Sequence, residues 1–156
     1  MKITGHSIGK IENQEIIKYR IAANSGTYID ILNYGGIITG IWVADFTGNF
    51  DNVVLNYDDL DSYINNPGYL GAIIGRHAGR IGMSQFKLKG DTYNLANNNG
   101  AHNLHGGVSG LDKKIWQVEQ LHNGLKLTYL SPDMEEGFPG NIRFEVSYQL
   151  HEPRSE

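Results

Sequence analysis

Residues 142–150, Ile-Arg-Phe-Glu-Val-Ser-Tyr-Gln-Leu, decide the fold class, because their apolar and polar side chains alternate without a break. Successive side chains of a β-strand point to opposite faces, so this period of two predicts a strand with one buried and one solvated face. Upstream, Asn123-Gly124 lies between Val118 and Leu127 and is the strongest two-residue hairpin signal of the chain. Both residues tolerate the positive φ of a type I′ turn, so paired strands are predicted over residues 115–130.

The first half of the chain repeats this pattern of short strands and turns. Further strands are predicted over residues 16–21, 26–32 and 37–43, and a short helix over residues 58–64. Many short strands with frequent turn signals are typical of an antiparallel β-sandwich or barrel. We therefore expect an all-β fold with at most one short helix, in a single domain over residues 1–156.

Composition excludes several functional classes. The chain of 156 residues has no cysteine, which rules out disulfides, thiolate metal sites and cysteine nucleophiles. Its net charge is −4 and neither sign is clustered, so we expect neither a nucleic-acid nor a membrane surface as partner. No stretch approaches the roughly 20 apolar residues of a spanning helix, and the N-terminus lacks the apolar core of a signal peptide. The cytoplasm is the expected location.

Two segments contain residues that could carry chemistry. Residues 71–82 hold four glycines, two arginines and a histidine. In one interpretation, the small residues leave room for a ligand beside the guanidinium donors. In the other, the glycines only permit tight strand crossing and the arginines are solvated. Residues 97–107 form an Asn- and Gly-rich loop with His102 and His105. A metal site there is disfavoured, because three-residue spacing brings ligands together on a helix and no further His or Cys lies nearby. The histidines could also simply bond the backbone.

Two acidic groups are assigned structural roles. The aspartates of residues 58–61 lack the glycine and terminal glutamate of an EF-hand loop, so helix capping is the preferred interpretation. Glu135 and Glu136 are flanked by Ser-Pro-Asp and Gly-Phe-Pro-Gly, which predicts a solvated loop rather than a catalytic base.

Five motifs in order resemble the aldose 1-epimerase (galactose mutarotase) family. They are Asn52-Val53-Val54-Leu55, Arg76-His77-Ala78-Gly79-Arg80-Ile81, Leu104-His105-Gly106-Gly107, Gly110-Leu111-Asp112-Lys113-Lys114-Ile115-Trp116, and Ser131-Pro132-Asp133 with Glu136-Gly137-Phe138-Pro139-Gly140-Asn141. The resemblance implies a mutarotase-like β-sandwich that binds a hexose such as galactose or glucose. It also implies interconversion of the α and β anomers by acid-base ring opening and reclosure, without a cofactor or a metal.

The resemblance also assigns roles to individual residues. Arg80 matches the substrate-binding arginine, and His105 matches the first of two active-site histidines, which bonds the sugar near its ring oxygen. Gly79, also in the substrate site, stands where many members have asparagine, so a contact to the sugar is expected to be missing. Arg76 is given a supporting structural role.

The chain departs from the family in length, since members are roughly twice as long. The resemblance places the second histidine and the glutamate base in the absent half, so the sandwich is expected to be truncated, with residues 151–156 as an atypical tail. The strand at 142–150 would then lack cover on its edge and apolar face, which predicts self-association or a complementing chain. Two alternatives stay open: a non-catalytic carbohydrate-binding β-sandwich, and a structural or regulatory fragment that recruits a partner.

Overall fold

The alternating stretch at the end of the chain forms the outer strand of a three-stranded antiparallel sheet. The computed structural model describes residues 1–151, and this sheet has the order β10-β11-β12. Its strands are β10 (Gln117–Leu121), β11 (Gly124–Ser131) and β12 (Ile142–Gln149). The predicted pairing over residues 115–130 is therefore confirmed.

The turn of this hairpin lies one residue earlier than predicted. Leu121 pairs with Gly124, so His122 and Asn123 form the turn, and neither has a positive φ. Gly124 is instead required by close approach, because a Cβ atom there would lie 2.0 Å from the carbonyl oxygen of Tyr148 on β12. Two adjacent residues with positive φ, as a type I′ turn requires, occur in the first hairpin at Glu12 (47°) and Asn13 (65°).

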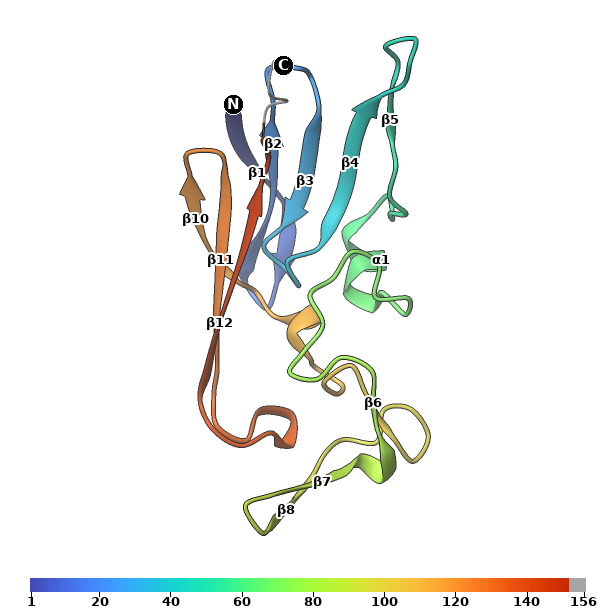
Figure 1. Ribbon diagram of the computed structural model, residues 1–156, viewed down its shortest axis with the longest axis vertical. Coiled ribbons are helices and arrows are strands. Elements are labelled where there is room, and N and C mark those ends of the chain that lie inside the picture. The colour runs from blue at the N-terminus through green and yellow to red at the C-terminus, as the bar shows by residue number, and fades with distance from the viewer. Residues whose placement is uncertain (152–156) are drawn as a thin grey trace.

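A second, five-stranded sheet contains the first third of the chain as an antiparallel meander (Figure 1). Its strands, in spatial and chain order, are β1 (Lys2–Ile11), β2 (Gln14–Ala22), β3 (Tyr28–Leu32), β4 (Ile38–Ala44) and β5 (Phe50–Asn52). The predicted hairpin between residues 16–21 and 26–32 is β2–β3.

The two sheets pack face to face around one core. Ile21 and Ile31 of the five-stranded sheet contact Leu125 and Leu127 of the three-stranded sheet, with Trp116 in the same buried cluster. Burying these side chains provides the main stabilisation of the sandwich. The predicted antiparallel β-sandwich is confirmed.

Strand β12 is better covered than the sequence predicted. Phe144, Val146 and Tyr148 pack against the core, so the prediction of an uncovered apolar face is wrong. The Tyr148 hydroxyl donates to the carbonyl of Gly36 at 2.7 Å, and burial raises the pKa of Tyr148 to about 12. The edge of β12 remains free, because among residues 1–151 the strand pairs only with β11.

One short helix, α1 (Leu60–Asn65), covers the outer face of the five-stranded sheet. The carboxylate of Asp59 accepts a hydrogen bond from the main-chain N–H of Ser62 at 2.8 Å, which confirms the capping role predicted for this acidic cluster. No helix within residues 1–151 is long and apolar enough to cross a membrane.

Two small antiparallel pairs lie at the end of the molecule opposite the N-terminus (Figure 1). They are β6 (Arg80–Ile81) with β9 (Asn103–Leu104), and β7 (Gln85–Leu88) with β8 (Asp91–Asn94). Three 3₁₀ turns complete the described chain: η1 (Gly82–Ser84), η2 (Leu111–Lys113) and η3 (Glu135–Gly137). The single-domain assignment stays a prediction, and residues 152–156 of the predicted tail lie outside the described residues.

Candidate functional site

The small β6–β9 pair brings the three predicted site residues together. Arg80 pairs with Leu104, so His105 follows directly on the neighbouring strand. The main-chain N–H of His105 donates to the carbonyl of Gly79 at 2.9 Å, and the N–H of Gly79 donates to Nδ1 of His105 at 3.1 Å. Arg80 and His105 therefore lie on adjacent backbone segments, although they are 25 positions apart in the sequence.

The hydrogen bond from Gly79 selects one of the two neutral tautomers of His105. Because Nδ1 accepts this hydrogen bond, the neutral ring carries its proton on Nε2. Tyr69 meets the imidazole edge-on, with ring centroids 4.7 Å apart, and limits its rotation. The fixed ring can donate a hydrogen bond from Nε2 to an oxygen atom of a ligand.

The backbone around His105 is unusual and tightly enclosed. His105 has a φ of 55°, in the left-handed region that non-glycine residues rarely adopt. Gly106 follows with a φ of 91°, and a Cβ atom there would lie 1.8 Å from the carbonyl oxygen of Gly75. The segment therefore needs glycine after the histidine, because no side chain fits between it and residues 75–76.

Two adjacent asparagines hold the Arg80 side chain and the backbone on either side of His105. Asn98 accepts from the N–H of Leu104 at 2.7 Å and donates to the carbonyls of Leu104 and Gly107, at 2.9 and 2.8 Å, so its bonds bracket His105. Asn99 accepts from Nε of Arg80 at 2.8 Å. Sequence reasoning noted this Asn-rich run but did not give either residue a role in positioning.

The site is an open surface. Arg80 is exposed and His105 is half-buried. The adjacent cavity of about 480 Å³ is mostly apolar and is lined by Arg76, His77, Phe86 and other residues, but by neither Arg80 nor His105.

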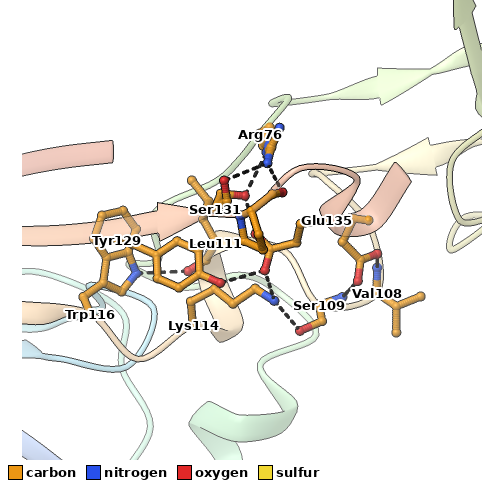
Figure 2. Close-up of polar contacts among 11 residues, drawn as sticks. Arg76, Val108, Ser109, Leu111, Lys114, Trp116, Tyr129, Ser131 and Glu135 are labelled. Carbon is orange, nitrogen blue, oxygen red and sulfur yellow. Dashed lines mark hydrogen bonds and ion pairs between the residues drawn. The ribbon is translucent and has the colours of Figure 1, made fainter. Parts of the chain in front are cut away.

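Arg76 links the Arg76–Ile81 motif to the loop between β11 and β12 (Figure 2). Its Nε donates to Oγ of Ser131 at 2.8 Å, and its two terminal nitrogens donate to five main-chain carbonyls of that loop. With all its donor groups occupied, Arg76 acts as a structural clamp, in agreement with the supporting role expected for it.

Glu135 is part of a half-buried network, so the prediction of a solvated loop is wrong. Figure 2 shows its carboxylate among Lys114, Tyr129 and Ser131. Lys114 Nζ lies 2.8 Å from it, the Tyr129 hydroxyl donates at 2.6 Å, and the Ser131 hydroxyl donates to its second oxygen. Burial opposes ionisation, but the bonds from Lys114, Ser131 and Tyr129 outweigh it and lower the pKa of Glu135. Burial and the bond to Glu135 raise the pKa of Tyr129.

Glu136 fixes the loop that follows His105. Its carboxylate accepts from the main-chain N–H groups of Val108 and Ser109, at 2.8 and 3.0 Å. Both neighbouring glutamates are thus engaged in structural bonds, and the absence of a catalytic-base role for them stays a prediction.

His102 lies near the site but has a separate bond. Its Nδ1 accepts from the main-chain N–H of Met83 at 3.1 Å, which agrees with the backbone-bonding alternative. Within residues 1–151, no group of three or more His, Asp or Glu side chains is arranged to hold a metal ion.

Asp112 is a buried acid that sequence reasoning missed. It is 3% exposed, and its Oδ1 atom has no hydrogen-bond partner among the described residues. Burial raises the pKa of Asp112, while a backbone hydrogen bond and the positive charges of Lys113 and Lys114 oppose this shift. Its position in the Gly110–Trp116 motif was the available signal, but burial of a carboxylate is not visible in sequence.

Sequence comparison places the chain among sugar epimerases. A family model described as aldose 1-epimerase matches residues 18–154. Galactose mutarotase of Bos taurus is 44% identical over 122 residues, which cover 78% of this chain and 36% of that protein. Aldose 1-epimerase of Streptococcus thermophilus is 32% identical over 158 residues, covering 97% and 44%.

Structural comparison gives the same result. The galactose 1-epimerase from Lactobacillus acidophilus NCFM has a TM-score of 0.81 and 25% identity, covering 96% of this chain and 44% of that one. The fold and the match define a mutarotase-like β-sandwich protein. The extent of the family match then settles the assignment: the chain belongs to the aldose 1-epimerase family, as the motifs predicted. It spans less than half the length of the relatives named here.

Proposed function

We propose that the chain takes part in the interconversion of the α and β anomers of a hexose such as galactose or glucose, with Arg80 and His105 binding the sugar. The observation that carries this proposal is the bond from Gly79 to Nδ1 of His105, which leaves Nε2–H as a donor on the residue that follows the strand paired with Arg80. The names of the relatives, galactose mutarotase and aldose 1-epimerase, support the substrate class.

The two donors suit the charge that develops during ring opening. As the bond between C1 and the ring oxygen breaks, that oxygen gains negative charge and takes up a proton. A fixed imidazole N–H and a guanidinium stabilise this oxygen more in the transition state than in the ground state. Opening also needs a base for the proton of the anomeric hydroxyl, and reclosure after rotation about C1–C2 reverses both transfers. We assign neither Glu135 nor Glu136 as this base, because both carboxylates are engaged elsewhere.

Polarimetry tests this function directly. Freshly dissolved α-D-galactose should drift to equilibrium faster with the protein, and His105→Asn should slow that drift. His102→Asn is the matched control, since His102 also accepts a backbone N–H through Nδ1 but lies outside the proposed contact. An unchanged rate in folded His105→Asn would remove His105 from the site. Saturable sugar binding without acceleration would overturn catalysis by this chain and favour the non-catalytic alternative.

We also propose that the free edge of β12 pairs with another chain, either a second copy or a complementing polypeptide. The support is that β12 pairs with β11 alone among residues 1–151, and unpaired strand edges favour such pairing. Size-exclusion chromatography with light scattering tests self-association. The proposal would be contradicted if the chain stayed monomeric at all concentrations and also failed to bind the remaining half of a full-length relative when that half was added.

A further inference from the structure

We propose a second binding site, for a neutral sugar ring, on the outer face of the five-stranded sheet. A cavity of about 490 Å³ lies there between strands β2–β4 and residues 56–63. This volume is in the range of small-molecule sites. Its lining includes Lys18, Arg20, Asp30 and Trp42.

Strand alternation explains why these side chains share one face. Ile21 and Ile31 point into the sandwich core, so Arg20 and Asp30, which are adjacent to them in sequence, point outward. Arg20 pairs directly with Asp30 across β2 and β3. Gly40 on β4 lies opposite Asp30, and a Cβ atom there would be 2.8 Å from the indole nitrogen of Trp42. The missing side chain makes room for the Trp42 ring.

The planar groups of this face are held in fixed positions. Nε and Nη2 of Arg20 each donate to one oxygen of the Asp30 carboxylate at 2.7 Å. The guanidinium carbon lies 3.8 Å from the ring centroid of Tyr28, and Tyr28 stacks on Trp42 with centroids 5.5 Å apart. Such a preorganised set loses little side-chain entropy when a ligand binds.

Two hydrogen-bond donors at the cavity are unused. Among residues 1–151, neither the Lys18 ammonium nor the Trp42 indole N–H makes a hydrogen bond to another residue, although both side chains line the cavity. The carboxylate of Asp30, on a residue 5% exposed, adds acceptor lone pairs beyond those that Arg20 occupies. The cavity therefore offers donors and acceptors together with an aromatic wall.

This combination fits a neutral, hydroxyl-rich ligand. The charges at the cavity nearly balance, because Lys18 and Arg20 face Asp30, Asp58 and Asp59, so a phosphate or a polycation gains little there. Each hydroxyl of a sugar can both donate and accept, and its C–H face can pack on the Trp42 ring. The inference does not depend on the proposed epimerase function, since neither Arg80 nor His105 lines this cavity.

Saturation-transfer difference NMR with methyl β-D-galactopyranoside tests the site. This sugar has no free anomeric hydroxyl and cannot mutarotate, so binding is read independently of catalysis. The expected result is saturable transfer to the sugar that persists in His105→Asn. Added to His105→Asn, Trp42→Ala should abolish this transfer, and Lys18→Ala should weaken binding about five- to tenfold, the effect of one lost hydrogen bond of about 1 kcal/mol or slightly more. Lys10→Ala, on exposed β1, is the matched control.

The outcomes separate the two sites. Saturable transfer that His105→Asn keeps and the folded double variant His105→Asn/Trp42→Ala loses supports the second site. Absence of saturable transfer, or binding by His105→Asn that the added Trp42→Ala or Lys18→Ala leaves unchanged, overturns it. Loss of all binding in His105→Asn assigns the sugar to the Arg80–His105 site alone. Competition by inorganic phosphate would show an anion site and overturn the choice of a neutral ligand.

Discussion

His105 and Gly79 are joined by reciprocal hydrogen bonds: the N–H of His105 donates to the Gly79 carbonyl at 2.9 Å, and the N–H of Gly79 donates to Nδ1 of His105 at 3.1 Å. The first bond fixes the position of the residue, and the second fixes the tautomer of its ring. Both depend only on the backbone of Gly79. A side chain at position 79 would therefore remove neither of these two bonds.

Gly79→Asn should therefore be tolerated and should strengthen hexose binding. A Cβ atom at this position meets nothing within 4 Å, but the φ of 88° disfavours any side chain and should cost about 1–2 kcal/mol of the free energy of unfolding. The new amide would add the sugar contact that the resemblance implies is missing here. Isothermal titration with galactose measures the gain, and unchanged affinity in the folded variant would contradict this role.

Asn98→Ala should loosen the segment that carries His105. The substitution removes three hydrogen bonds to Leu104 and Gly107, so unfolding free energy should fall by about 1–3 kcal/mol and galactose binding should weaken. Chemical denaturation and titration measure the two effects. Asn97→Ala is the matched control, because Asn97 is exposed. Equal behaviour of the two variants would show that Asn98 does not position His105.

Glu135→Gln should destabilise the protein at neutral pH and reduce its sensitivity to acid. The pKa of Glu135 is lowered in the folded state, so its stabilisation is complete above the unfolded pKa and is lost as the pH falls through the folded pKa. The expected loss at neutral pH is about 1–3 kcal/mol, measured by denaturation over a pH series. Glu145→Gln alters an exposed pair with Arg143 and should have little effect. An identical pH series for Glu135→Gln and wild type would refute the network's role.

Asp112→Asn should have the opposite effect. Burial raises the pKa of Asp112, so unfolding free energy falls as the pH rises from the unfolded to the folded pKa, and the cost remains above that window. The neutral amide avoids this cost, so the variant should melt at a higher temperature than wild type at neutral pH and lose that advantage in acid. A variant that melts lower than wild type at neutral pH would show that the charged form of Asp112 is stabilising.

The sequence predicts elements that depend on local pattern, but it does not predict contacts between residues that are distant along the chain. Alternation alone predicts β12, and the aspartates of residues 58–61 indicate the N-terminal end of α1, because both signals are local. The hairpin turn was displaced by one residue, because Gly124 is needed for contact with Tyr148 rather than for its φ. Glu135 was placed in solvent, because its partner Lys114 lies 21 residues upstream.

The candidate site shows the same limit. Arg80 and His105 were identified through the family motifs, and the β6–β9 pairing that joins them follows from the fold. The roles of Asn98 and Asn99 depend on hydrogen bonds across this pairing, so their type and spacing gave no sign of them.

The central claim is that His105 presents Nε2–H to a bound hexose beside Arg80, and imidazole ¹⁵N NMR tests it most directly. The free protein at neutral pH should show His105 with a protonated Nε2 and an unprotonated Nδ1, and saturating galactose should shift the Nε2 resonance. His102 should stay unchanged in the same spectrum. A His105 ring protonated on Nδ1, or one whose resonances ignore galactose while the sugar is demonstrably bound, would contradict the claim.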